Sequence, residues 1–302
     1  MKVLVTGGAG FIGGHMVDKL VELGHKVTIV DNEAANQHET FRWNEKANKH
    51  VVDICDVVTM REIFEKYKFD CVFHMAAETK IQETLENPDK TFAVNVGGTL
   101  KVLELARQTN VKKVILSSTS SIYGQQEPPL NEDLDPDCLN PYALSKLEAE
   151  NLCKLYTRVH GLDTVMFRYF NVYGERMPDK GQYAPVIAIF NKQKKSEKPL
   201  TIVGTGKQSR DLVHVYDVVS ANIAAAISEN KEICGQVFNV GTGKNYSVLQ
   251  IADMIDPEGE REFLPERENE AETTKADISK IEKFLGWKPE IDLKEWITKA
   301  NS

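Results

Sequence analysis

Short apolar segments alternate with amphipathic segments along the first half of the chain. The apolar segments predict strands at Lys2–Thr6, Lys26–Asp31, His50–Asp53, Cys71–His74, Lys113–Ser117 and Asp163–Arg168. Apolar positions at a spacing of three to four residues predict the intervening helices, among them Phe11–Leu23, Pro88–Gln108 and Tyr142–His160. The polar stretch Asn32–Lys49 is expected to form a loop. This alternation predicts an α/β fold, a doubly wound parallel sheet covered by helices on both faces.

The pattern changes near Asn171, where the alternation loosens and Gly, Pro and charged residues become frequent. We therefore predict a larger domain formed by residues 1–170, to which residues 213–242 return. Residues 171–212 and 243–302 are expected to form a smaller C-terminal α/β domain. A chain of 302 residues is long enough for two such domains sharing a cleft.

Composition narrows the class of protein. The net charge of −8 argues against a nucleic-acid scaffold, because phosphate backbones require basic faces. The five cysteines are scattered and contain no CxxC pair, which favours a reducing compartment over disulfides and predicts no metal site. No apolar run is long enough to span a bilayer, and the first strand begins at Lys2, which leaves no room for a signal peptide. We expect a cytoplasmic protein without a membrane or nucleic-acid partner.

A glycine cluster, VLVTGGAGFIG at residues 3–13, joins the first strand to the first helix. Its G-x-G-x-x-G spacing allows a tight turn and lets a pyrophosphate approach backbone N–H groups at a helix N-terminus. Asp31 follows at the end of the second strand, where a carboxylate binds ribose hydroxyls and repels a 2′-phosphate. The context predicts a Rossmann-type NAD site. Asp53, after the third strand, is expected either to face the adenine or to cap the strand end.

Tyr142 and Lys146 are four residues apart on a predicted helix and therefore share a face. A free phenol has a pKa near 10, and an ammonium group together with a cationic nicotinamide would favour the phenolate. The pair is a candidate general base, although YxxxK by itself is also typical of an ordinary amphipathic surface. Upstream, the run LSSTSSIYG (116–124) places five hydroxyl residues at the end of an apolar strand and no acidic residue among them.

With these motifs the chain resembles the extended short-chain dehydrogenase/reductase family, and within it the nucleotide-sugar epimerases of the UDP-glucose 4-epimerase type. The resemblance covers nearly the whole chain. It includes TGGAGFIG (6–13), HMAA (74–77), NVGGT with Asn95, SSTSSIYG (117–124), YALSK (142–146), RYFNVYG (168–174), GTGKQSRDLVHVYDV (204–218), FNVGTG (238–243) and LGWKP (285–289).

The resemblance implies roles for individual residues. The implied NAD contacts are Gly7, Gly10, Phe11, Ile12, Asp31, Asn32, Asp53, Ile54, Ala76, Asn95, Ser117, Tyr142, Lys146 and Tyr169. The implied catalytic residues are Thr119, which binds the sugar hydroxyl, Tyr142 as the base, and Lys146, which lowers the pKa of that base. The implied contacts to a UDP-sugar are Thr119, Tyr142, Asn171, Arg210, Arg267 and Thr274. From the residues alone, a surface side chain paired with a neighbouring acid such as Asp211 or Glu268 is the favoured reading of either arginine.

The same fold hosts dehydratases, decarboxylases, reductases and epimerases, all of which the resemblance implies begin by oxidising the sugar at C4. The first two classes carry an acid directly after the active-site Thr, whereas Ser120 and Ser121 follow Thr119 here. We therefore expect NAD-dependent C4 epimerisation of a UDP-hexose such as UDP-glucose or UDP-galactose. Another nucleotide-sugar reaction (4,6-dehydration, reduction, uronate 4-epimerisation) and a non-catalytic NAD-binding protein remain as alternatives.

Two further positions bear on the substrate. Thr274 lies where the resemblance places a size gate to the sugar 2-substituent, so a small residue there predicts acceptance of N-acetylhexosamines. Lys80 is either a solvated lysine or a partner for an acidic sugar. Leu147, Leu152, Leu155 and Val159 form an apolar stripe, which indicates core packing or, as the resemblance implies, a homodimer interface.

Overall fold

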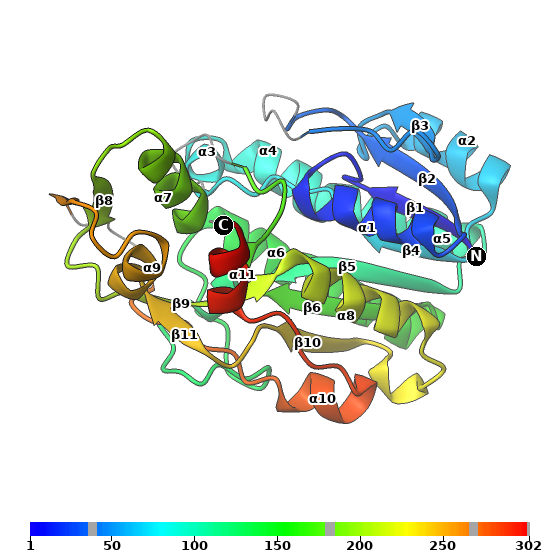
Figure 1. Ribbon diagram of the computed structural model, residues 1–302. Coiled ribbons are helices and arrows are strands. Elements are labelled where there is room, and N and C mark those ends of the chain that lie inside the picture. Colours follow the sequence, from blue (N-terminus) through cyan, green and yellow to red (C-terminus); the bar gives the residue numbers. More distant parts are fainter. Residues whose placement is uncertain (36–40, 179–184, 266–270, 301–302) are drawn as a thin grey trace.

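The computed structural model describes residues 1–35, 41–178, 185–265 and 271–300 (Figure 1). Its largest feature is a parallel seven-stranded sheet in the order β10-β6-β5-β4-β1-β2-β3. The strands are β1 (Lys2–Thr6), β2 (Lys26–Asp31), β3 (Asn48–Val51), β4 (Cys71–His74), β5 (Lys113–Thr119), β6 (Asp163–Tyr169) and β10 (Gln236–Val240). The strand order reverses between β1 and β4, which is where doubly wound sheets bind their ligands. The predicted fold class is confirmed.

Helices cover both faces of this sheet because its strands are apolar on both sides. In β1, Val3 and Val5 pack with α1 (Phe11–Glu22), α8 (Val215–Ile227) and α10 (Ser279–Leu285). Leu4 points the other way and packs with α2 (Val57–Tyr67), α5 (Thr99–Gln108) and α6 (Pro141–His160). Since successive strand residues face opposite sides, a continuous apolar strand requires two helical layers.

The helix that carries the predicted base has defined ends. Asn140 caps α6 by accepting a hydrogen bond from the Ala143 N–H over 2.9 Å, and Pro141 occupies the first turn. Gly161 ends the helix in the left-handed conformation with φ of 68°. These signals hold a 20-residue helix whose first turn lies beside the end of β5.

The remaining elements form smaller units at one end of the molecule (Figure 1). Three strands, β7 (Asn171–Tyr173), β9 (Ser209–His214) and β11 (Asn245–Ser247), form one sheet, and β8 (Leu200–Val203) and β12 (Arg261–Leu264) pair in another. With α7 (Val186–Lys195), α9 (Val248–Ile255) and α11 (Leu293–Ala300) they surround a separate apolar core that includes Phe190, Ile202 and Ile251. The N-terminal region also contains α3 (Ile81–Glu86) and α4 (Pro88–Phe92). Two short 3₁₀ turns, Ser120–Tyr123 and Lys231–Ile233, stand between the larger elements.

The chain crosses between these units more than once. α8 packs against α1, and β10 pairs with β6, so residues 215–240 lie with the large sheet. α10 comes from the C-terminal stretch that we assigned to the smaller domain, yet Ile281 is buried in the core of the large sheet. The domain boundaries therefore stay a prediction.

The predicted boundaries of α1 and β6 and the start of α6 differ from the observed ones by one residue, and three other elements differ more. The third strand is Asn48–Val51 and not His50–Asp53, because the register pairs Asn48 with Thr28 at the sheet edge, where exposed residues carry no apolar signal. This strand therefore also shortens the expected loop at Asn32–Lys49. β5 continues to Thr119 because Ser117–Thr119 pair with β6. The expected helix Pro88–Gln108 contains a π-helical segment, Ala93–Gly98, between α4 and α5.

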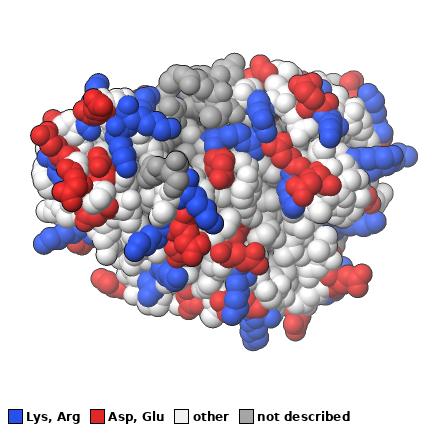
Figure 2. Space-filling model, viewed as in Figure 1, with Lys and Arg blue, Asp and Glu red and all other residues white. Residues whose placement is uncertain are grey.

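Two whole-molecule properties bear on partners. None of the helices within the described ranges is long and apolar enough to cross a membrane. On the face shown in Figure 2, Lys and Arg side chains are interspersed with Asp and Glu side chains. An anionic ligand on this face would therefore be bound by individual cations and not by a continuous basic surface.

Candidate nucleotide-sugar site

A cavity of about 930 Å³ lies along the carboxyl ends of the large-sheet strands, at the point where the strand order reverses. The predicted residues that line it are Gly7, Gly10, Phe11, Ile12, Asp31, Asn32, Asp53, Ile54, Ala76, Ser117, Thr119, Tyr142, Lys146 and Tyr169. Segments far apart in the sequence thus meet at one cavity.

The glycine loop leaves room for a ligand because side chains are excluded from it. Gly7 has φ of 70°, and a Cβ atom there would lie 2.8 Å from the Ala76 nitrogen. At Gly13 a Cβ atom would collide with the carbonyl oxygen of Gly7. The residue that precedes α1, Gly10, has no side chain that could cap the helix, so the first N–H groups of α1 are not bound by a capping side chain. This loop can receive a pyrophosphate at the start of α1.

Two carboxylates line the cavity beside the glycine loop. Asp31 accepts hydrogen bonds from the Ala9 N–H (3.0 Å) and the Glu33 N–H (2.8 Å), and burial raises its pKa, with both bonds opposing. Asp53 accepts from the Cys55 N–H over 2.7 Å and from the Asn32 amide over 3.0 Å. Burial alone would raise the pKa of Asp53, but these bonds lower it. Asp53 both lines the cavity and holds the turn after β3.

Asn95 has a different place from the one we expected. It lies on the π-helical segment, is 1% exposed and does not line the cavity. Its amide accepts from the Glu78 N–H (2.8 Å) and donates to the Glu78 carbonyl (2.9 Å) and to Ser145 (2.9 Å). Because its amide binds Glu78 on one side and Ser145 on the other, Asn95 holds the segment after β4 against α6.

The predicted catalytic residues approach the cavity from β5 and α6. Thr119 accepts a hydrogen bond from the Ser121 N–H over 3.1 Å. Burial raises the pKa of Tyr142, with hydrogen bonding to Thr119 opposing. Burial lowers the pKa of Lys146 to about 8, with Cys153 and Glu150 opposing. In the protein without ligand the pKa of the phenol is therefore raised, and the positive charge of a bound nicotinamide, which the prediction included, would favour the phenolate.

The first two hydroxyls of the SSTSS run bind partners on other elements. Ser117 hydrogen bonds to the Tyr169 hydroxyl over 3.0 Å, and Tyr169 also bonds to Asn222 on α8. Ser118 donates to the buried carboxylate of Glu150 over 2.6 Å. The sequence pattern did not reveal these partners, because they come from other elements.

Beside Lys80, which the sequence analysis singled out, Glu78 and Glu83 line the cavity near α3, and sequence reasoning missed these two acids. Glu78 pairs with Lys90 over 2.8 Å, and Lys80 pairs with Glu83 over 2.8 Å. The two acids are therefore held by lysines. The sequence signal that could have revealed these acids was their position soon after the HMAA segment, in the loop that follows it and the first turn of α3, because loops after strand ends line such cavities.

Of the predicted substrate residues, Thr119 and Tyr142 line this cavity, whereas Asn171, Arg210 and Thr274 do not. Asn171 is the first residue of β7, and β7 pairs with β9, which carries Arg210. Arg210 donates to the backbone carbonyls of Ser209 (3.0 Å) and Glu272 (3.2 Å). Thr274 is buried and its hydroxyl accepts from the Asp211 N–H over 3.2 Å. Arg267 lies outside the described residues.

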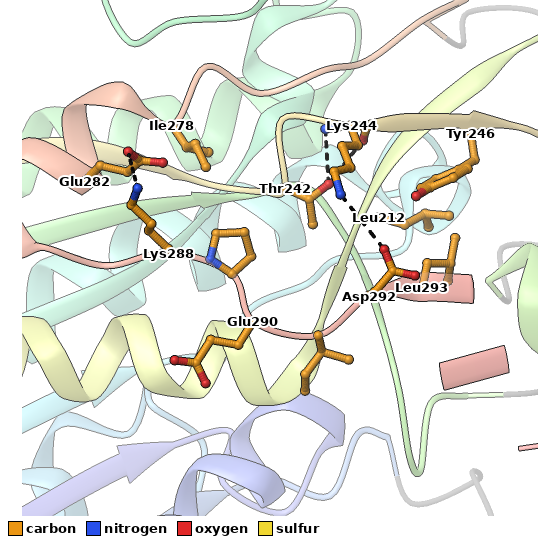
Figure 3. Close-up of a pocket in the computed structure, with 12 residues that line it drawn as sticks. Leu212, Thr242, Lys244, Tyr246, Ile278, Glu282, Lys288, Glu290, Asp292 and Leu293 are labelled. Carbon is orange, nitrogen blue, oxygen red and sulfur yellow. Dashed lines mark hydrogen bonds and ion pairs between the residues drawn. The ribbon is translucent and has the colours of Figure 1, made fainter. Parts of the chain in front are cut away.

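A second cavity of about 290 Å³ lies behind β9, near the start of α11 (Figure 3). Four of its charged lining residues form two pairs: Lys288 lies 3.4 Å from Glu282, and Lys244 lies 3.9 Å from Asp292. None of the predicted site residues in the described ranges lines it. The larger cavity is therefore the candidate active site.

The residues of the larger cavity fit NAD. The glycine loop has space only for backbone, Asp31 offers a carboxylate at the ribose position, and Tyr142 and Lys146 lie at the other end of the lining. When bound, NAD accepts a hydride at its nicotinamide ring and returns it.

Comparison with known proteins agrees with this geometry. Residues 3–241 match the family of NAD-dependent epimerases and dehydratases. The chain is 40% identical to a putative UDP-glucose 4-epimerase of Methanocaldococcus jannaschii, over 99% of this chain and 96% of that protein. It is 37% identical to a UDP-glucuronate 4-epimerase of Thermodesulfobacterium geofontis, over 98% of this chain and 94% of that protein.

A solved structure is similar over the whole fold. The crystal structure of Thermotoga maritima UDP-glucose 4-epimerase with UDP-glucose matches with a TM-score of 0.92 and 34% identity, covering 98% of this chain and 96% of that one. The chain belongs to the NAD-dependent epimerase/dehydratase family, whose cofactor is NAD.

Proposed function

We propose that this protein interconverts the C4 epimers of a UDP-hexose, such as UDP-glucose and UDP-galactose, through a transient 4-keto sugar. One observation carries the proposal: Thr119, Tyr142 and Lys146 line the cavity that holds the glycine loop, and the residues after Thr119 are hydroxyls. A hydroxyl cannot act as a base near neutral pH. The site therefore lacks, on this strand, the acid required for eliminating water or losing CO2.

The chain's own residues supply the proton steps. Thr119 would bind the O4 hydroxyl, and Tyr142 in its phenolate form would remove the O4 proton, while the C4 hydrogen would pass as hydride to bound NAD. The Lys146 ammonium stabilises that phenolate. After the sugar turns, Tyr142 would return the proton to O4 and the hydride would return from the bound cofactor to C4, so no net oxidation would occur.

The nucleotide must stay bound while the sugar turns. Arg210 and Arg267 are the groups we assign to the diphosphate, since a guanidinium binds phosphate oxygens through two parallel hydrogen bonds. Asn171 begins the strand next to the one that carries Arg210, which supports its role in binding the sugar nucleotide. We retain residues 171–212 and 243–302 as the region that binds the nucleotide sugar.

A UDP-uronate is the second candidate substrate. Lys80 lines the cavity, and one similar protein is a UDP-glucuronate 4-epimerase. Lys80 is paired with Glu83 on the next turn, so a substrate carboxylate would have to compete with that acid.

We further propose a cytoplasmic homodimer. The described cysteines are free thiols, which suits a reducing compartment. On α6, Leu144, Leu155 and Val159 are exposed by 40–59%, and Leu100 on α5 by 43%. Because α5 and α6 are neighbours, these side chains form an apolar surface that a second copy would cover. Light scattering at micromolar concentration tests this, and a monomer would contradict it.

The decisive experiment incubates the purified protein with UDP-glucose, UDP-N-acetylglucosamine and UDP-glucuronate, without added cofactor. The C4 epimer of one of them is the expected product, formed with the NAD that co-purifies. A 4-keto-6-deoxy product would refute the proposal. Tyr142→Phe serves as the control, since it should remove nearly all turnover while leaving NAD bound.

A further inference from the structure

Helix α6 carries a third ionisable residue behind Tyr142 and Lys146. Glu150 lies four residues after Lys146, so the three side chains follow one face of the helix. Glu150 is 0% exposed and does not line the cavity. A fully buried carboxylate is costly unless it is paired, so its partners show what it does.

The carboxylate of Glu150 is bound by two strands at once. Its Oε1 accepts from the Ser118 hydroxyl over 2.6 Å and from Arg168 Nε over 3.0 Å. Its Oε2 accepts from the second Arg168 nitrogen over 2.8 Å. The guanidinium thus binds both oxygens in the fork geometry, while Ser118 uses one of the remaining lone pairs.

These partners lie at the site: Ser118 lines the cavity while its hydroxyl donates to Glu150, and Arg168 is buried beside it. Ser118 and Arg168 are opposite each other in the register of β5 and β6. Thr119 directly follows Ser118, and Tyr169 directly follows Arg168, and both of these residues line the cavity. Glu150 therefore joins the ends of β5 and β6 to α6, one turn behind Lys146.

Arg168 cannot easily move to another partner. It is 3% exposed, its Cζ lies 4.8 Å from the centre of the Tyr123 ring, and Tyr123 donates to Asn239 on β10 over 2.7 Å. Its remaining nitrogen has no hydrogen-bond partner among the described residues. The Glu150 carboxylate is therefore the group that compensates this buried cation.

We propose that Glu150 is a positioning residue for the reaction: through Ser118 and Arg168 it fixes Thr119 against the turn of α6 that carries Tyr142 and Lys146. Hydride and proton transfer depend steeply on the distances between reacting groups, so loosening this connection should slow the chemical step more than it weakens binding. The assignment rests on the proposed roles of Thr119 and Tyr142.

Glu150 also contributes charge near the base. The groups that act on Lys146 are Cys153 and Glu150 on α6 and His74 on β4, with Tyr142 one turn before it. Cys153 and Glu150 raise the pKa of Lys146, whereas burial lowers it. Removing the Glu150 charge leaves Arg168 as an uncompensated cation, which lowers the pKa of Lys146 further.

Two variants and one control separate these effects. Ser118→Ala removes the hydrogen bond to β5 and leaves the Glu150–Arg168 pair intact, so it is the variant with the smaller risk to folding. Glu150→Gln keeps the shape and removes the charge. Glu148→Gln makes the same change two residues away, at a half-buried position on α6.

The readouts are hydrogen–deuterium exchange of residues 116–124 in the protein without substrate, kcat and KM, and the pH profile of kcat. Ser118→Ala should exchange faster in this segment and lose kcat by roughly tenfold, with KM within about twofold. Glu150→Gln should lose more and shift the alkaline limb of the profile to lower pH. Glu148→Gln should match the wild type.

A loss of kcat in Ser118→Ala smaller than about threefold would overturn the proposal, whatever Glu150→Gln does. The same comparison is made on the rate of single-turnover reduction of the bound NAD by a UDP-sugar. The family resemblance implies that every reaction of this family begins with this step, so the rate can be measured whichever product forms. If the wild type reduces its NAD but forms no epimer, the proposed function fails and the test of Glu150 still stands.

Discussion

Gly13 lies so close to Gly7 that even a methyl group on its α-carbon would collide with the Gly7 carbonyl oxygen. The helix start and the turn before it thus share one space, and the turn cannot open without moving α1. This contact explains why the third glycine of the G-x-G-x-x-G motif, Gly13, cannot be replaced by a larger residue.

Gly13→Ala should therefore lose bound NAD, because the Cβ atom pushes the turn away from the start of α1. Gly24→Ala is the matched control: Gly24 ends the same helix with φ of 77°, and a Cβ atom there meets nothing within 4 Å. The control should lose about 1–2 kcal/mol of stability from backbone strain and keep its NAD. The absorbance of NAD released on denaturation measures the difference. Full NAD content in Gly13→Ala would contradict this reading of the loop.

Asp31 should decide between NAD and NADP. Its carboxylate is held by the Ala9 and Glu33 N–H groups at the end of β2, where a ribose 2′-phosphate would meet a like charge. Asp31→Asn should weaken NAD binding and strengthen NADP binding by about tenfold each, as titration calorimetry on the cofactor-free protein would show. Asp53→Asn should change the binding of both cofactors equally. An unchanged preference in Asp31→Asn would place the ribose elsewhere.

Lys146 should reduce stability while it supports catalysis. Its pKa is lowered to about 8 by burial, so between this value and the ordinary lysine pKa near 10.5 the unfolded chain binds more protons than the folded one. The stability of the cofactor-free protein should therefore rise with pH across that window. Lys146→Met should be more stable at pH 7 by a few kcal/mol, of the order of 1.4 kcal/mol per pKa unit, and inactive. Urea titrations at pH 7 and pH 10 measure this, and a stability gain that is equal at both pH values would refute it.

Local patterns were sufficient to predict the sheet and the cofactor loop. Each of these is encoded within a short segment: a strand, a glycine turn and an acid such as Asp31 at the next strand end. The bounds of the edge strand β3 were predicted two residues too late, because its exposed residues carry no periodic apolar signal.

The polar contacts behind the site could not be predicted, because they join residues distant in sequence. Ser118 meets Glu150, and Asn95 meets Glu78 and Ser145, only after the sheet and α6 have assembled. The spacing of Tyr142, Lys146 and Glu150 on one helix face was the available signal for Glu150. The π-helical turn that carries Asn95 has no sequence signature that we recognise.

Thr274 gives the sharpest test of substrate choice. It is 9% exposed, and its hydroxyl accepts from the Asp211 N–H one residue after Arg210. If this position borders the sugar 2-substituent, Thr274→Tyr should abolish turnover of UDP-N-acetylglucosamine and leave UDP-glucose turnover within about threefold, since steric exclusion acts on the larger group alone. Thr274→Val removes the hydroxyl at constant size, and it should leave the ratio of kcat/KM for the two substrates unchanged. Equal losses on both substrates in Thr274→Tyr would show that the residue supports the Arg210 strand and does not select the sugar.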